Sequence, residues 1–433
     1  MASMTAREQL MLELVNRARM DPKGEAARLD VVLASGEGKP VPVLAGNDAL
    51  RASAYNHSGW MLLNDSFTRD ETEPSQSFIA VTPLDRMKAY GYALSGSYSY
   101  AENISWQGNV EVPDFTQLIA VQHADLFASA AARGRMLDAA YQEASIGQQA
   151  GDFEQDGETF VTSMVTQDFI TSGAKVFITG VIYDDKVVAN DFYDFGEGVA
   201  SRKVASGEAI DKAGPGGGYE LEFTASGIKT VTFDLKGADL ALDVALAAAN
   251  AKVDVVDRTE IWTNASVQSQ STAITELHAL GVSKLVLIGS DVAETITGNR
   301  AANQLLGQGG ADVIAGHRGK DTLMGGAGSD TLTGGAGADT FVYAARKESR
   351  AGAPDTIVKF GVGDDRIDLS GLIEGKFKYR GEAPITGAHQ VALTESGKHV
   401  IVHVNLDADA ADEMTILLTV THLSAMSKGD FIL

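Results

Sequence analysis

Between residues 289 and 342 the sequence repeats every nine residues. Taking Gly289 as the first position gives the windows GSDVAETIT, GNRAANQLL, GQGGADVIA, GHRGKDTLM, GGAGSDTLT and GGAGADTFV. The first position is always Gly, the eighth is always Ile, Leu or Phe, and the sixth always carries a side-chain oxygen. A flexible linker has no reason to place an apolar anchor at every ninth residue, so the repeat predicts a folded solenoid.

Six polar, glycine-rich residues followed by three residues with one apolar side chain predict a turn and then a short strand. Two windows complete one coil, so equivalent positions of alternate windows stack at the strand spacing of ~4.8 Å. The sixth positions then form two ladders, 294, 312, 330 and 303, 321, 339. Carboxylates in a ladder repel each other until a cation lies between them, and calcium prefers oxygen ligands. The spacing therefore predicts several calcium ions and folding that depends on them.

These windows resemble the RTX, or haemolysin-type, nonapeptide GGxGxDxUx. The resemblance implies a parallel β-roll over residues 261–375 whose first rungs, with Glu294 in place of Asp, are capping rungs. It continues through DTIVKFGVGDDRIDLSG, for which a solvated acidic loop is the alternative. The candidate calcium-site residues are the side-chain ligands Asn303, Asp312, Asp321, Asp330 and Asp339, the turn residues Gly307, Gly309, Gly316, Arg318, Gly325, Ala327, Gly328, Gly334, Ala336 and Gly337, and the further acids Asp355, Asp364, Asp365 and Asp368.

Composition supports this interpretation. The net charge of −23 disfavours nucleic acid and anionic membranes as partners but suits a divalent cation. The absence of cysteine excludes disulfides, thiolate zinc sites and a cysteine nucleophile. We expect no transmembrane segment and no N-terminal signal peptide. The segment LSAMSKGDFIL, in a C-terminal β region over 376–433, is similar to uncleaved type I secretion signals, which implies an extracellular protein that a type I apparatus exports unfolded.

The sequence before the repeats predicts two further domains. Residues 1–174 are expected to be α+β, with a capping box of Thr5 and Glu8 opening the first helix, further helices from about Asp48 and after Asp114, and a strand over 158–170. Residues 175–260 contain the short β runs VFITGVIY, GYELEF and KTVTFDL, and they predict a small β-sandwich that spaces the head from the roll. The expected architecture is therefore multidomain.

The ordered pieces LVNRARMDP, AYNHSGWM, AENI, RGRML and VTQDF resemble the bacterial branch of the CAP, or SCP-like, superfamily. The resemblance implies an α-β-α sandwich with a cleft bordered by two histidines and two acidic residues. Glu102 matches one of the acids, but Arg69 and Ala132 occupy the positions where the family places histidines. The resemblance thus implies a degenerate tetrad that lacks its metal ligands.

His57 and His123 lie on apolar helical faces, where each is either a packed core residue or a neighbour of Glu102 at the cleft. Three hypotheses follow for the head. It binds a lipid, a glycan or a cell-surface protein without catalysis; it is a hydrolase, a peptidase or esterase, that uses Glu102, His57 and His123; or the chain is a structural matrix or adhesion component. The absence of GxSxG and HExxH motifs favours the first.

Overall fold

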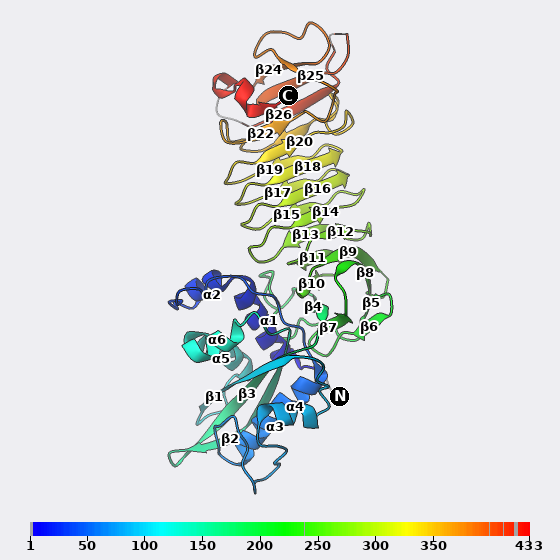
Figure 1. The fold of residues 1–433 in the computed structure, drawn as a ribbon. Helices are drawn as coiled ribbons and strands as arrows, with labels where there is room; N and C mark the ends of the chain where they lie inside the picture. Colours follow the sequence, from blue (N-terminus) through cyan, green and yellow to red (C-terminus); the bar gives the residue numbers. More distant parts are fainter. Residues whose placement is uncertain (1–2, 238, 398, 410, 420–422) are drawn as a thin grey trace. The chain divides into compact units, whose positions relative to one another are not determined.

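The computed structural model describes residues 3–237, 239–397, 399–409, 411–419 and 423–433. The chain forms two compact units, the first made of residues 1–238 and 245–258 and the second of residues 239–244 and 259–433 (Figure 1). The predicted boundaries inside these units, at 174/175, 260/261 and 375/376, stay predictions. No helix among the described residues is long and apolar enough to cross a membrane.

The first unit begins with the predicted capping box. The Thr5 side chain accepts the N–H of Glu8, and the Glu8 carboxylate accepts the N–H of Thr5 at 2.7 Å. The helix that follows buries Leu10, Leu14 and Ala18, as its apolar spacing predicts. The helices of this unit are α1 (Ala6–Met20), α2 (Pro22–Arg28), α3 (Asp48–Leu63), α4 (Pro83–Ala89), α5 (Phe115–Ala128) and α6 (Ala130–Met136).

An antiparallel sheet of order β1-β3-β2 lies between these helices. Its strands are β1 (Tyr98–Asn109), β2 (Glu143–Gln155) and β3 (Glu158–Ser172). On the central strand, Thr166 contacts Ser58 of α3 at 2.9 Å, whereas Ser163 donates to Gln122 of α5 at 2.9 Å. Alternate side chains of a strand point to opposite faces, so α3 and α5 cover opposite faces of the sheet. The result is a three-layer arrangement, while membership of the CAP superfamily stays a prediction.

Two further groups of hydrogen-bonded strands complete the first unit. One has the order β10-β4-β7 and the other β8-β5-β6. The ring of Tyr219 on β7 packs edge-on against Phe233 on β8, with ring centroids 5.6 Å apart. The strands are β4 (Val176–Tyr183), β5 (Lys203–Ser206), β6 (Ala209–Lys212), β7 (Gly218–Phe223), β8 (Gly227–Asp234) and β10 (Ala251–Val256).

The second unit is a roll of short parallel strands arranged in two sheets. One sheet contains β12 (Val267–Ser269), β14 (Val286–Ile288), β16 (Gln304–Gly309), β18 (Thr322–Ala327), β20 (Thr340–Val342), β22 (Arg366–Asp368) and β27 (Phe431–Ile432), with β9 (Leu240–Leu246) antiparallel to β12. The other contains β11 (Glu260–Thr263), β13 (Glu276–Ala279), β15 (Thr295–Thr297), β17 (Val313–Ala315), β19 (Thr331–Thr333), β21 (Asp355–Ile357) and β26 (Met414–Leu418).

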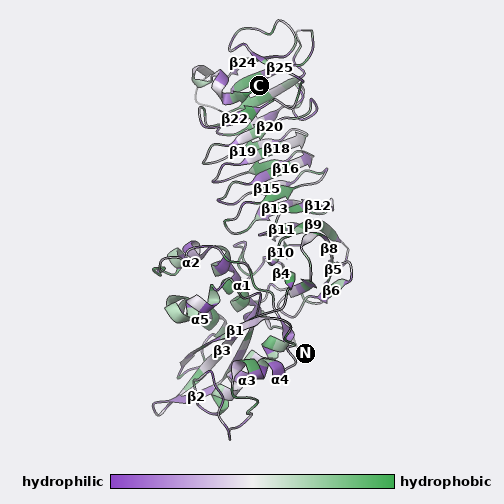
Figure 2. Cartoon of the chain, in the orientation of Figure 1, coloured by the Kyte–Doolittle hydropathy of each residue, from purple (hydrophilic) through white to green (hydrophobic). Residues whose placement is uncertain are grey.

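The register of these strands is the one that the repeat predicts. Leu287, Leu305, Leu323 and Phe341 are aligned across β14, β16, β18 and β20, so equivalent residues lie one two-window coil apart. All four side chains are fully buried. Hydrophobic segments accordingly recur along successive strands of the roll (Figure 2). The apolar eighth positions thus form the core, and the polar turns remain at the edges.

After the windows the roll continues into antiparallel strands. β26 pairs in parallel with β21 on one side and antiparallel with β25 (His399–Asn405) on the other. β24 (Gln390–Ser396) pairs antiparallel with β25, and β23 (Lys378–Tyr379) pairs in parallel with β24. Residues of the predicted export segment form the short helix η2 (Lys428–Asp430) and β27, which pairs with β22. This segment is therefore also a rung of the roll.

Candidate metal centres and a candidate ligand groove

The sixth-position aspartates of the roll form two ladders held by one repeated hydrogen bond. The Oδ1 atom of Asp312 accepts the N–H of Glu294 at 2.9 Å, one coil earlier in the same ladder. The same contact joins Asp321 to Asn303 at 2.7 Å. It continues from Asp330 to Asp312, from Asp339 to Asp321, from Asp355 to Asp330 and from Asp365 to Asp339, at 2.9 to 3.0 Å. The ladders therefore extend beyond the repeat windows.

The second carboxylate oxygen has no hydrogen-bond partner in most of these rungs. The Oδ2 atoms of Asp312, Asp321, Asp330, Asp339 and Asp355 are all buried and lack such a partner among the described residues. Burial, opposed by the backbone hydrogen bond, raises the pKa of Asp312 and of Asp321 to about 7. It raises the pKa of Asp355 to about 8, with the nearby Asp330 carboxylate adding to the shift. Without a cation these groups hold protons that exposed aspartates would release.

The first-position glycines make room for these oxygens. A Cβ atom placed on Gly325 would lie 2.2 Å from Oδ2 of Asp330, and one on Gly307 would lie 2.2 Å from Oδ2 of Asp312. Gly316 and Gly334 have the same relation to Asp321 and Asp339, at 2.4 and 2.3 Å. The invariant glycine is thus explained by the carboxylate that lies over it. An all-oxygen donor set with buried, unpaired carboxylate atoms fits calcium.

The other predicted ladder residues differ in their surroundings. Glu294 and Asn303 occupy the first rungs, and Oδ1 of Asn303 accepts the N–H of Asn299 at 2.8 Å. Both carboxylate oxygens of Asp365 are hydrogen-bonded, since Oδ2 accepts the N–H of Gly361 at 2.7 Å. Asp364 is exposed, and Asp368 accepts from Ser370. These five residues are poorer candidates for direct calcium ligands than the aspartates with an unpaired Oδ2.

The predicted turn residues lie beside the ladders. Gly309 is buried at the end of β16, and the carbonyl groups of Ala327 and Ala336 accept the N–H groups of Gly310 and Gly319, each at 3.0 Å. Arg318 and Ala336 form an isolated bridge between turns that are one coil apart. The remaining turn candidates are Gly328, which follows β18, and Gly337 in the turn before β20.

In the first unit, a groove of about 430 Å³ brings together the three positions that the family resemblance singled out. Arg69, Glu102 and Ala132 all line it, and Arg135 adds a second arginine. Apolar surface comes from Phe67, Ile104, Trp106 and Leu126. Neither His57 nor His123 lines this groove, and both side chains are fully buried. Of the three catalytic candidates, only Glu102 borders the space in which a ligand would lie.

Behind the groove, Glu102 belongs to a buried polar cluster. The Arg86 Nη2 atom donates to Oε2 of Glu102 at 2.6 Å, and its Nε atom lies 3.7 Å from Glu71. The His57 ring contacts Glu71 at 3.2 Å through Nδ1 and lies 3.7 Å from Glu102 through Nε2. Burial raises the pKa of Glu102 well above its usual value, and the neighbouring carboxyl of Asp168 adds to the rise.

Sequence reasoning missed the acidic partners in this cluster. Burial also raises the pKa of Asp168, to about 6, so the two carboxyl groups compete for a proton. Asp168 lies in the VTQDF strand two residues after Thr166, so both side chains point to the face of the sheet that α3 covers. This two-residue spacing was a usable signal in the sequence. Glu71 carries no such pattern, because it lies in a loop. Burial lowers the pKa of His57, which favours the neutral imidazole.

His123 has a different partner. Its Nε2 atom contacts Oε1 of Glu25 at 2.9 Å, and Glu25 also accepts two hydrogen bonds from Arg17 at 2.8 Å. Despite its burial, these hydrogen bonds lower the pKa of Glu25 to about 2, so its carboxylate is charged. Burial lowers the pKa of His123. The described contacts therefore place His57 beside Glu102, and His123 in a separate ion-pair network with α2.

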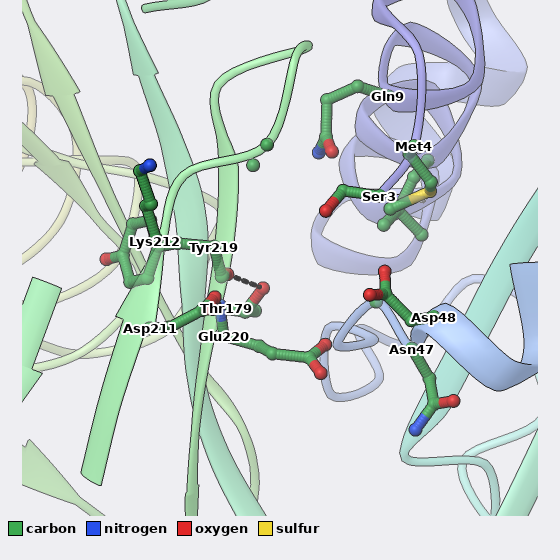
Figure 3. A pocket seen from close by; sticks show the side chains of 14 residues that line it. Ser3, Met4, Gln9, Asn47, Asp48, Thr179, Asp211, Lys212, Tyr219 and Glu220 are labelled. Atoms are coloured by element: carbon green, nitrogen blue, oxygen red, sulfur yellow. Dashed lines mark hydrogen bonds between the residues drawn. The ribbon is translucent and has the colours of Figure 1, made fainter. Parts of the chain in front are cut away.

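A second, smaller cavity of about 90 Å³ lies between the N-terminal segment and the small sheets of the first unit (Figure 3). Asp48, Asp211 and Glu220 line it together with Asn47 and Thr179. Burial and the surrounding acids raise the pKa of Glu220 well above its usual value. This volume has room for several water molecules.

Comparison with known proteins describes the roll. Residues 301–433 match the family model "Peptidase M10 serralysin C terminal", which covers less than half of the chain. This segment is thus an RTX-like β-roll of the serralysin C-terminal class. No curated protein matches the chain significantly.

Among solved structures, two subunits of the mannuronan C5-epimerase of Azotobacter vinelandii are 31% and 29% identical. They cover 34% and 35% of this chain and 80% and 92% of their own, with TM-scores of 0.28 and 0.27. An extracellular protein of Bacillus anthracis that contains an SCP domain is 19% identical over 38% of this chain and 40% of its own, with a TM-score of 0.23.

Proposed function

We propose that this chain is a secreted calcium-binding protein whose roll holds several calcium ions along its two ladders. The observation that carries the proposal is the row of buried Oδ2 atoms without partners in Asp312, Asp321, Asp330, Asp339 and Asp355. Each such atom costs about 1–3 kcal/mol when it is left without a partner. A doubly charged ion beside each rung removes this cost and the repulsion between neighbouring carboxylates.

Export follows from the same chemistry. We propose that the chain leaves the cell through a type I apparatus, in line with the resemblance of LSAMSKGDFIL to the signals of such substrates. Cytosolic calcium is too low to fill sites of extracellular type, which bind at about 10⁻⁴–10⁻³ M. The ladders would therefore remain unfolded before export and fold in extracellular calcium.

We propose that the N-terminal unit is a CAP-like head that binds a ligand and does not catalyse a reaction. The groove offers Arg69 and Arg135 for an anionic or hydroxyl-rich group, and Phe67 and Trp106 for an apolar one. Lipid and glycan arrays probed with the wild-type chain and with Arg69→Glu test this assignment. Loss of the binding signal in the variant supports ligand binding in the groove. Equal signal in both proteins would mean that the ligand binds at another surface.

The calcium proposal is tested by titrating the full chain from EDTA into calcium while recording far-UV circular dichroism. We expect β signal to appear with calcium, and Asp321→Asn to shift the midpoint to higher calcium. The matched control is Glu374→Gln, which removes one charge from an exposed carboxylate of the same unit that is not among the candidate ligands. A spectrum that chelation leaves unchanged, or equal midpoints for the two variants, contradicts the proposal.

A further inference from the structure

The first coil of the second unit carries a cluster of metal-ligating side chains that lies outside the nonapeptide windows. β11 and β13 pair in parallel, with Glu260 opposite Glu276 and Trp262 opposite His278. Their neighbours Ile261 and Leu277 are fully buried, so these four side chains share the outer face of the sheet. One ligand atom from each of Glu260, Glu276 and His278 lies within 4.8 Å of the other two.

We propose that Glu260, Glu276 and His278 bind one zinc ion. The His278 Nε2 atom and the Glu276 Oε2 atom are 3.0 Å apart. In a tetrahedral zinc site with bonds of about 2.1 Å, neighbouring ligand atoms are about 3.4 Å apart, so small side-chain rotations suffice. An imidazole nitrogen suits zinc and disfavours calcium, and the two carboxylates supply the balancing charge. Water completes the fourth position.

Trp262 holds the ligands in place. Its ring stacks on the imidazole of His278, with centroids 4.1 Å apart and planes 13° apart. Its Nε1 atom donates to Oε2 of Glu260 at 3.4 Å. The imidazole is thus restrained by packing and one carboxylate by a hydrogen bond, which lowers the entropy lost on binding. The His278 side chain is 12% exposed and that of Glu276 is 39% exposed, so an ion reaches the site from solvent.

This zinc site is independent of the proposed calcium ladders, because it uses neither the glycine turns nor the sixth-position aspartates. Zinc would join β11 to β13 across one strand pair. The first coil, where the repeat pattern has not yet begun, would therefore be fastened by a metal of a different kind.

Isothermal titration calorimetry of the full chain with zinc alone as the probe tests the site, in a buffer kept at about 5 mM calcium to fill oxygen-only sites. We expect one zinc ion per chain, and His278→Gln to weaken its binding by at least about tenfold. The matched control is His317→Gln, an exposed turn position with φ 73°, because Gln308 adopts φ 74° at the equivalent place in the preceding window. Equal affinity in His278→Gln, or no zinc binding by the wild type, overturns the proposal.

A second readout separates binding from folding. Zinc should change the tryptophan emission of the wild type, and Trp262→Phe should abolish that change while calorimetric binding persists. Glu276→Gln, with a calcium-loaded circular dichroism spectrum equal to that of the wild type, should also weaken zinc binding if His278→Gln fails to fold. Emission changes that persist in Trp262→Phe would place the zinc elsewhere and contradict the assignment.

Discussion

At the scale of single residues, the spacing between a glycine and the aspartate five positions later determines whether a rung can form. We predict that Gly325→Ala destabilises the calcium-loaded roll by about 1–3 kcal/mol, because the added Cβ would lie 2.2 Å from Oδ2 of Asp330. Gly352→Ala is the control, since its Cβ would meet no atom within 4 Å. Thermal unfolding in calcium measures both. Equal losses would show that the effect comes from the glycine's backbone freedom alone.

Protonation of the ladders gives a second prediction at this scale. Burial raises the pKa of Asp312 and Asp321 from 3.8 to about 7 in the metal-free fold. Protons therefore compete with calcium, and we expect calorimetry to show calcium affinity at least about tenfold weaker at pH 6 than at pH 8.

The sign reverses without calcium. A raised folded-state pKa contributes stability that is complete below the unfolded value of 3.8 and is lost as the pH rises through about 7. In EDTA, the roll should hence show more β signal at pH 5 than at pH 8. A roll that is more ordered at pH 8 under chelation would contradict the protonation of the ladders.

The buried polar cluster behind the groove gives a third prediction at the scale of single residues. Arg86→Ala removes the buried cation beside Glu71 and the hydrogen-bond donor to Glu102, so we expect a loss of about 3–5 kcal/mol in unfolding experiments. Glu102→Gln should cost about 1.5 kcal/mol or less, because the raised pKa of Glu102 already favours an uncharged side chain of the same shape. A larger cost for Glu102→Gln than for Arg86→Ala would mean that Glu102 is charged.

Single residues also mark the limit of what the sequence predicts. The helical pattern placed His57 and His123 on buried faces, and both are buried. It could not distinguish packing from catalysis, because their acidic partners lie 14 and 98 residues away, Glu71 in a loop and Glu25 in the short helix α2. The structure supplied those partners, and the roles of His57, His123 and Glu102 in any chemistry stay predictions.

At the scale of elements, the roll is predictable because the repeat places residues that pair between neighbouring strands at a fixed distance along the sequence. The strand registers follow that interval from β14 to β20. Beyond β20 the ladder partners are instead 25 and 26 residues apart, Asp355 with Asp330 and Asp365 with Asp339. The sequence named Asp355 and Asp365 as candidates, but no periodicity remained to assign their rungs.

The apolar column supports a prediction at this scale. Leu323 of β18 is fully buried between Leu305 and Phe341, so we expect Leu323→Ala to cost about 2–5 kcal/mol. Val313→Ala on β17 is the control, because Val313 faces outward with half of its surface exposed and should change stability by less than about 0.5 kcal/mol. Thermal unfolding of the calcium-loaded protein compares the two. Similar losses would contradict the assigned core.

At the scale of the whole molecule, the two units obtain their stability in different ways. The first has an apolar core and buried ion pairs, such as Lys252 with Glu13 at 2.7 Å, whereas the second has unpaired carboxylates in its ladders. We predict that limited proteolysis of the full chain in EDTA removes residues 259–433 and leaves the first unit protected. In calcium both should resist cleavage, as mass spectrometry of the fragments would show. Cleavage that begins in the first unit under chelation would contradict this division.

The two-faced coil has a consequence for how a chain of this kind changes length. Each window supplies one face, and the following window supplies the other. Loss of a single window would move every later strand of the roll to the opposite sheet, and β21 and β22 would exchange their neighbouring strands. Loss of a pair restores the original alignment. Viable shortening or lengthening therefore proceeds by even numbers of windows, and the count has a parity that substitutions cannot alter.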